Sequence, residues 1–202
     1  MKLHTHHILS ELESKDPNMV LRIVVTSRGL TDISCLQHFG NLQILNIANN
    51  KISDLSFLQK LSLITFIADY NPITSISQIS SQDKLENLSL SSCKLSLESL
   101  KPISSLKNLR RITLFQTPAS ENAHFYSEII SMNNTMQFLN EERVREPNGD
   151  LTQLDKFIES IPNQHRKFEY KIESWLPEAA FEVFDLPGFS AICQELEGAL
   201  GK

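Results

Sequence analysis

Cysteine, glycine and basic residues are all scarce in this chain of 202 residues, and each scarcity argues against a class of protein. The three cysteines, Cys35, Cys93 and Cys193, are far apart and form no CxxC pair, so the chain has no disulfide framework and we expect a reducing compartment. The six glycines form no glycine-rich phosphate loop. Nineteen Lys and Arg against 24 Asp and Glu give a net charge of −5, which argues against direct binding of nucleic acid.

Long apolar runs are also missing. No stretch approaches the roughly 18 consecutive apolar residues that a membrane-spanning helix needs. The first residues, MKLHTHHILSELESKD, lack the apolar segment of a secretory signal. We therefore expect a cytoplasmic or nuclear protein with no membrane contact.

What the sequence does contain is one motif repeated five times. The clearest copy runs over residues 42–52 and reads LxxLxLxxNxI. The copies open at positions 20, 42, 63, 85 and 109, so that they are 22, 21, 22 and 24 residues apart. One such repeat cannot bury its own apolar face, but stacked repeats form a continuous core.

This pattern resembles the leucine-rich repeats, in the short subclass of about 22 residues. The resemblance implies that each LxxLxL piece is a short parallel strand. It also implies that the Asn turns inward and bonds backbone groups of the neighbouring turn. Asn50 and Asn71 occupy that position in two repeats, whereas Arg28, Cys93 and Thr117 occupy it in the others. Because burying the unpaired charge of Arg28 would be costly, we expect the first repeat to be irregular there, with Gly29 helping the chain to turn.

The fold class that follows is α/β: a right-handed leucine-rich-repeat solenoid with a parallel sheet, helical caps and a C-terminal extension. We expect an N-terminal helical cap over residues 1–19, with a short amphipathic helix within residues 3–14. The repeats span residues 20–117, a C-terminal cap spans residues 118–145, and the extension spans residues 146–202. Apolar pairs three residues apart predict a 3₁₀ turn in each repeat. The longer fourth repeat predicts a wider turn or short helix between Leu95 and Leu100.

The residues after the last repeat resemble the C-terminal cap of intracellular leucine-rich-repeat proteins. That cap has an NP turn, a helix with a Tyr, and a closing segment ending in Asp. Here Thr117-Pro118, Tyr126 and Asn140 stand in these places. The chain resembles most the group that includes the acidic leucine-rich nuclear phosphoproteins, the spliceosomal A-prime protein and the leucine-rich-repeat dynein light chain. It lacks the long Asp/Glu tail of the first of these, so no histone or chromatin role is implied.

The extension differs from the repeats in charge and aromatic content. From residue 145 onward there are six Lys and Arg against eleven Asp and Glu. The pattern predicts a helix over residues 151–161, a strand over residues 168–172 and a helix over residues 190–200. The extension is also rich in aromatic residues, which favour burial. It either packs on the repeats or makes a second contact with a partner.

The sequence shows no arrangement of residues that would support catalysis or hold a metal or cofactor. It contains no nucleophile elbow, no HExxH and no carboxylate pair in a recognisable pattern. His4, His6 and His7 lie close together, but a zinc site needs about four ligands held by a fold. Cys93 lies at an inward position, where a thiol is inert. We therefore expect no enzyme, no cofactor and no metal.

The informative surface is the outer side of the strands. Residues between the core leucines point outward by strand alternation, and we interpret Val24, Ile44 and Ile67 as an apolar row across three strands. An apolar patch rimmed by polar groups is typical of a contact site. The candidate partner-binding residues are Val24, Ile44, Asn46, Ile67, Asp69, Tyr70, Ser89, Arg111, Thr113 and Phe115.

These residues predict an interaction module or adaptor that binds a helix or loop of another protein on the concave sheet face. Four of them are expected anchors, namely Ile44, Ile67, Tyr70 and Phe115, while Asp69 and Arg111 are expected to set charge specificity. The alternatives are that the extension covers this face, that the chain is a subunit of a ribonucleoprotein or cytoskeletal complex, or that it regulates a phosphatase.

Overall fold

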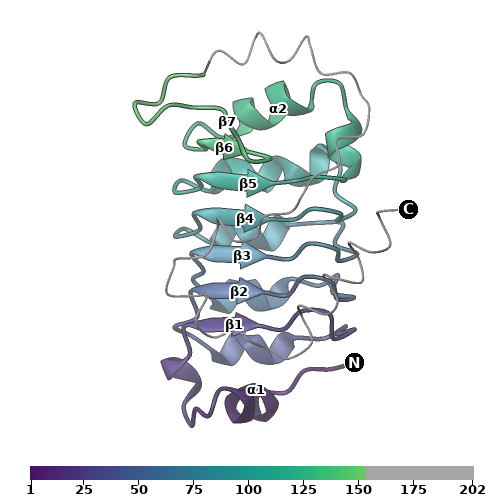
Figure 1. Ribbon diagram of the computed structural model, residues 1–202, viewed down its shortest axis with the longest axis vertical. Helices are drawn as coiled ribbons and strands as arrows, with labels where there is room; N and C mark the ends of the chain where they lie inside the picture. Colours follow the sequence, from purple (N-terminus) through teal and green to yellow (C-terminus); the bar gives the residue numbers. More distant parts are fainter. Residues whose placement is uncertain (153–202) are drawn as a thin grey trace, which may run out of the picture. The chain divides into compact units, whose positions relative to one another are not determined.

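The structure, a computed structural model, describes residues 1–152. The predicted strand over residues 168–172 and helix over residues 190–200 lie outside the described residues, as does the helix predicted over residues 151–161 apart from its first two residues, of which Leu151 forms an isolated bridge with Arg145. Within residues 1–152 the dominant feature is one sheet whose strands follow one another in chain order (Figure 1). The strands are β1 (Arg22–Val24), β2 (Ile44–Asn46), β3 (Thr65–Ile67), β4 (Asn87–Ser89), β5 (Arg111–Thr113), β6 (Phe138–Leu139) and β7 (Glu142–Arg143). All neighbours are parallel except β6 and β7, which pair antiparallel.

Each of the first five strands is short because only its central residue faces the core. That residue is fully or almost fully buried in every repeat, from Ile23 to Ile112. The apolar residue two positions after this central residue also faces the core. Ile47 and Leu90, for example, are fully buried. The stacked repeats thus share one continuous core, and the predicted α/β solenoid with a parallel sheet is confirmed.

The return path of each repeat is a 3₁₀ segment on the side of the core opposite the sheet (Figure 1). Apolar residues at three-residue spacing, such as Leu55 and Leu58, bury one side of each segment. The fourth repeat has the longest of these segments, as its two additional residues predict. The return segments are η2 (Ser34–His38), η3 (Ser56–Lys60), η4 (Ser77–Ser81) and η5 (Glu98–Ser105), while η1 (Pro17–Met19) precedes β1 and η6 (Pro118–Glu121) follows β5.

The inward polar position behaves as the repeat pattern implies. Asn71 is buried; its side-chain amide donates to the carbonyls of Ile47 and Ala68 at 3.0 Å, and its side-chain oxygen accepts from the Ile52 N–H at 2.9 Å. Arg28 instead points out and pairs with Glu11 through two contacts of 2.7 and 3.0 Å. Gly29 follows it with φ of +62°, a conformation that glycine adopts without strain. The irregular first repeat is therefore confirmed.

Helices lie at both ends of the sheet (Figure 1). At the first end, α1 (Thr5–Glu11) buries Ile8, while Leu12 is 47% exposed just beyond the helix. At the other end, Thr117 opens η6 with a capping box: its hydroxyl accepts from the Ser120 N–H at 3.2 Å. The helix α2 (Phe125–Met132) follows, and β6 then rejoins the sheet.

Candidate interaction face

The outer face of the sheet carries two rows of side chains, which the strand register defines. The first and third residues of each three-residue strand lie opposite the core, because successive side chains alternate. The first row is Arg22, Ile44, Thr65, Asn87 and Arg111, and the second row is Val24, Asn46, Ile67, Ser89 and Thr113.

The expectation of one apolar row was wrong. Val24 pairs with Asn46, and Asn46 pairs with Ile67, whereas Ile44 lies in the other row between Arg22 and Thr65. The reason is that Ile44 is the first residue of its strand while Val24 and Ile67 are the third residues of theirs. The apolar side chains therefore alternate with polar ones on this face.

Burial differs along the face. Val24, Ile44 and Asn46 on the first two strands are partly exposed, and so are Arg111 and Phe115 near the fifth. On the middle strands, by contrast, Ile67 is only 8% exposed. Asp69, Ser89 and Thr113 are buried too, whereas Tyr70 is 49% exposed. A probe of this face therefore belongs at Tyr70 or Ile44, because a charge placed at Ile67 would be buried and would disturb the fold.

Asp69 connects two neighbouring repeats. Its Oδ1 accepts a hydrogen bond from the Ser89 hydroxyl at 2.6 Å and another from the Ser91 N–H at 2.7 Å. A carboxylate taken out of water needs such donors. Beside this group, the hydroxyl oxygens of Ser91 and Thr113 are buried and have no hydrogen-bond partner within the described part of the chain. The middle of the face thus combines a fixed carboxylate with unused hydroxyl groups.

A row of residues with left-handed backbone conformation borders the face where the strands end. One residue in each repeat, directly before the inward polar position, has a φ near +55°: Ser27, Asn49, Tyr70, Ser92 and Gln116. Polar side chains in this row bond one another, since Asn49 donates to Ser27 at 2.9 Å and Ser92 donates to Gln116 at 2.8 Å.

Tyr70 stands between these two pairs, in a conformation that bulky residues rarely adopt. Its exposed ring is thus set on a turn that a smaller polar residue would form with less strain. The repeat pattern identified Tyr70 as outward-pointing. Its backbone strain could have been inferred from its place directly before the inward Asn.

The far end of the face, at β5 to β7, is aromatic and basic. The guanidinium of Arg111 lies 4.4 Å from the centre of the Phe138 ring, and that of Arg143 lies 5.1 Å from it. Both distances suit cation–π attraction. Sequence reasoning selected Arg111 but missed Phe138, because β6 is only two residues long and departs from the LxxLxL pattern.

The described thiols are unsuited to nucleophilic chemistry. Burial raises the pKa of Cys93 to about 12, and it also raises the pKa of Cys35. Both are therefore protonated at neutral pH, and a thiol is a poor nucleophile and metal ligand. In residues 1–152 no three His, Cys, Asp or Glu side chains are placed to hold a metal ion. No helix in this range has the length and apolar character needed to cross a membrane.

Stacked parallel strands, an inward Asn in two repeats and 3₁₀ return segments together define the fold of leucine-rich-repeat proteins. No family model matches the chain, and no curated protein matches it. Solved structures do match. A chain of the Drosophila melanogaster SNF/U2A′ complex is similar with a TM-score of 0.56 and 17% identity, covering 80% of this chain and 99% of that one. Internalin C2 of Listeria monocytogenes is similar with a TM-score of 0.53 and 18% identity, covering 66% of this chain and 61% of its own.

At identities this low, the two likenesses establish the fold alone. They agree with the resemblance drawn from the repeats and the C-terminal cap: the chain has the fold of a short leucine-rich-repeat protein, and this fold is similar to that of a chain of the SNF/U2A′ complex.

Proposed function

We propose that this protein is a non-catalytic interaction module, or adaptor, whose outer sheet face binds a helix or loop of another protein. The observation that carries the proposal is the setting of Tyr70, an exposed aromatic ring on a strained turn in the middle of a hydrogen-bonded row. Aromatic residues are enriched among the side chains that dominate binding energy. Backbone strain is also commonly found at functional sites.

The rest of the face supports protein recognition. Ile44 and Val24 add partly exposed apolar area to the same face. The unused hydroxyls of Ser91 and Thr113 gain hydrogen bonds if polar groups of a partner cover them. Because hydrogen bonds and packing fix the face beforehand, little ordering entropy is lost on binding.

In this proposal Arg111 and Asp69 have different tasks. Arg111, held over Phe138, presents a positive charge near one end of the face. Asp69 bonds the neighbouring repeat, so its first contribution is to hold Ser89 and the backbone of Ser91 in place.

The proposal includes the division of the chain and its location. The caps at residues 1–19 and 118–145 close the repeats of residues 20–117, and residues 146–202 supply a second contact. The separated cysteines favour a reducing compartment, which supports a location in the cytoplasm or nucleus.

A photo-crosslinking experiment tests the proposal. A benzophenone amino acid replaces Tyr70 in the full chain, and the matched control carries it at Gln59, an exposed residue of η3 on the opposite side. We expect position 70, and not position 59, to form a covalent product with a defined protein in cells. Ile44→Asp on the same chain should reduce that product at least about tenfold, since it replaces an apolar side chain of the face with a charge.

Equal products at positions 70 and 59, or a product that Ile44→Asp leaves unchanged, would contradict the assigned face. Nuclease treatment before crosslinking separates direct protein contact from assembly through RNA. A product that survives nuclease supports direct binding, whereas loss of the product would overturn it in favour of a ribonucleoprotein role.

A further inference from the structure

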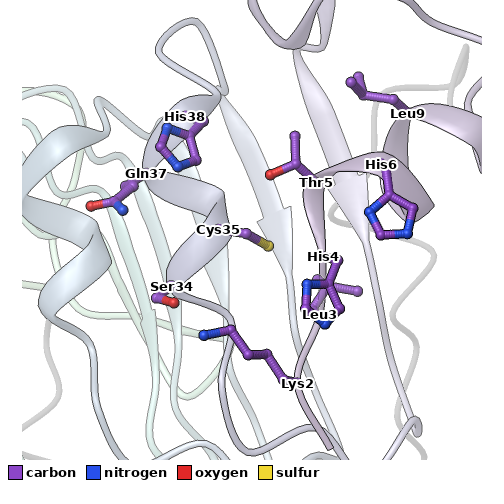
Figure 2. A pocket seen from close by; sticks show the side chains of 10 residues that line it. All are labelled: Lys2, Leu3, His4, Thr5, His6, Leu9, Ser34, Cys35, Gln37 and His38. Atoms are coloured by element: carbon purple, nitrogen blue, oxygen red, sulfur yellow. The ribbon is translucent and has the colours of Figure 1, made fainter.

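A hollow lies at the N-terminal end of the repeats, away from the face considered above. Its walls come from residues 2–9 on one side and from η2 on the other, and its volume is about 580 Å³ (Figure 2). This volume falls within the range of about 300–1,000 Å³ that is typical of small-molecule sites. Leu3 and Leu9 form an apolar part of the lining. The hollow can therefore contact the apolar portion of an organic ligand as well as its polar groups.

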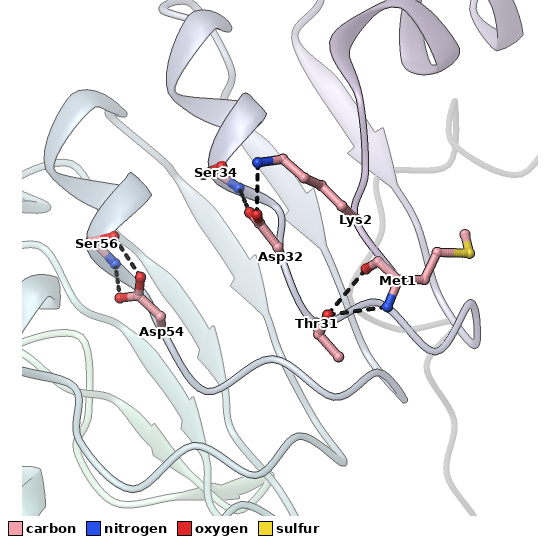
Figure 3. A network of polar contacts seen from close by, with 7 residues as sticks. All are labelled: Met1, Lys2, Thr31, Asp32, Ser34, Asp54 and Ser56. Atoms are coloured by element: carbon pink, nitrogen blue, oxygen red, sulfur yellow. Dashed lines mark hydrogen bonds and ion pairs between the residues drawn. The ribbon is translucent and has the colours of Figure 1, made fainter.

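Hydrogen bonds fix the two walls relative to each other. The Leu3 N–H donates to the carbonyl of Asp32 at 2.9 Å, and the Thr31 N–H donates to the carbonyl of Met1 at 2.9 Å. The carboxylate of Asp32 also accepts from the Ser34 N–H and pairs with Lys2, each at 2.9 Å (Figure 3). One carboxylate thus holds the N-terminal segment and the start of η2 together, and the hollow exists before any ligand enters.

The polar lining consists of groups suited to an anion. It includes Lys2 and three imidazoles, those of His4, His6 and His38, together with the side-chain amide of Gln37. Figure 2 shows these side chains coming from both walls, with the Cys35 thiol between them. None of the lining residues is acidic. Because burial raises the pKa of Cys35, that thiol adds no negative charge at neutral pH.

We propose that this hollow binds the phosphate group of a small molecule, with affinity that increases as its histidines become protonated. A tetrahedral anion with several acceptor oxygens matches several cationic donors around one space, because charge-assisted hydrogen bonds are the strong ones. Histidine changes its charge between about pH 5 and pH 8, so it makes the site sensitive to physiological pH. The apolar part of the hollow receives the organic portion of the ligand.

The surrounding charges agree with this assignment. Of the acidic groups on the neighbouring elements, Asp32 caps η2 and pairs with Lys2, so that it offsets the charge of this lysine and leaves the histidines to supply net positive charge. Glu11 pairs with Arg28 at the end of α1. The titratable and charged groups on the N-terminal segment, α1, η2 and the turn before it are the amino group of Met1, Lys2, His4, His6, His7, Glu11, Asp32, Cys35 and His38. Protonation of three imidazoles therefore leaves the hollow with net positive charge.

Sulfate is the sharpest first probe, because it is a tetrahedral dianion whose charge does not change between about pH 6 and pH 8, the range in which histidine titrates. Titration of the full chain at constant ionic strength, followed by NMR of the imidazole carbons, should give saturable shifts at His4, His6 and His38. The affinity should fall about tenfold or more between about pH 6 and pH 8. Inorganic phosphate and phenyl phosphate should bind at the same residues, and tighter binding of phenyl phosphate would show that the organic group is also held.

Variants separate this site from general attraction of anions. His4→Gln and His38→Gln should each weaken sulfate binding about fivefold or more without changing the melting temperature, because both side chains are exposed. The matched control is His124→Gln, since His124 is exposed, directly precedes α2 and does not line the hollow. Equal shifts at His124, an affinity independent of pH, or no saturation would show an adventitious ion only and overturn the proposal. Because no partner protein is involved, this outcome leaves the proposed function of the sheet face untouched.

Discussion

The second and third repeats differ from the fourth and fifth in the side chains that form hydrogen bonds with their buried backbone N–H and C=O groups. Asn50 makes five hydrogen bonds that reach both its own repeat and the one before it, to Arg28, Leu30, Val25, Ile47 and Ala48. Cys93 makes one weak bond at the same position, from its thiol to the carbonyl of Ala68 at 3.4 Å. Thr117 bonds only within its own repeat, to the carbonyl of Leu114 and the N–H of Ser120.

The chain nevertheless follows the same path in all four repeats. The comparison shows that apolar stacking determines the path, while the inward polar residue sets how firmly each repeat is tied to its neighbour. In the later repeats other amides share this task. The side-chain oxygen of Asn140 accepts from the Leu114 N–H at 2.7 Å, and Asn133 donates to the carbonyls of Ile103 and Leu106 at 2.9 Å.

The largest effect is expected where the asparagine is removed. Asn71→Ala leaves the buried N–H of Ile52 without its partner. It also removes one of the two side-chain donors to each of the carbonyls of Ile47 and Ala68, which keep Asn50 and the weak Cys93 thiol respectively. Because a buried unsatisfied group costs about 1–3 kcal/mol and each lost hydrogen bond about 1 kcal/mol, the free energy of unfolding should fall by about 2–4 kcal/mol. Urea denaturation followed by circular dichroism measures this loss.

The control for Asn71→Ala is Asn41→Ala, because Asn41 is exposed and donates a single side-chain bond to the carbonyl of Asn18. Its cost should stay below about 1 kcal/mol. Similar losses for both variants would show that the inward position has no special role.

A smaller effect is expected at the equivalent position of the fourth repeat. Cys93→Ala removes one weak hydrogen bond and a little buried volume, so stability should fall by only about 1–2 kcal/mol. Cys93→Asn extends the comparison of the third and fourth repeats, because it places at the inward position of the fourth repeat the same side-chain amide that Asn71 has in the third. If Cys93→Ala costs as much as Asn71→Ala, hydrogen bonding does not explain the difference between the two regions.

The third effect concerns the turn residues that precede the inward position. Tyr70→Asn should stabilise the protein by about 0.5–1 kcal/mol, because Asn tolerates the left-handed conformation better than Tyr does. The same substitution should weaken partner capture. Tyr70→Phe keeps the ring and the strain, and should therefore change stability little. A loss of stability in Tyr70→Asn would show that the ring contributes more to folding than its strain costs.

The smallest effect is expected at the N-terminal end, where Asp32 contributes to the contacts between the first repeat and the N-terminal cap. The Ser34 N–H and then the Lys2 ammonium lower the pKa of Asp32 from 3.8 to about 2. Its carboxylate thus adds stability above the unfolded value of 3.8, and this contribution is lost as the pH falls toward about 2.

Asp32→Asn keeps an acceptor for Ser34 but removes the ionisable group. At neutral pH this variant should be slightly less stable than the parent protein, and denaturant titrations at successively lower pH should show the difference vanishing between about pH 4 and pH 2. Asp54→Asn is the matched control, because Asp54 caps Ser56 in the same way and no cation pairs with it among the described ion pairs. A difference that grows in acid would contradict the assigned role of the Asp32 carboxylate.

The repeat pattern predicted the fold well, because burial dictates the spacing of Leu42, Leu45 and Ile47 and this spacing is visible in the sequence. It predicted the outer face less well. Burial says nothing of which outward residues lie beside one another, so Ile44 was assigned to the wrong row. Gln82 was missed entirely: it is buried and bonds Leu63, Leu58 and Leu61, although Gln is ordinarily a surface residue. The repeat alignment could have found it, because Gln82 stands three residues before Leu85, as the buried Phe39 and Leu106 do before Leu42 and Leu109.

The eight-residue segment η5 has a practical consequence. Its two additional residues are accommodated on the side away from the sheet, and the strands on either side, β4 and β5, keep the same parallel register as the other pairs. Length added at this point therefore leaves the geometry of the next coil unaltered. A peptide tag or a fluorescent reporter inserted near Ser96 would give a labelled protein for imaging whose recognition surface is undisturbed.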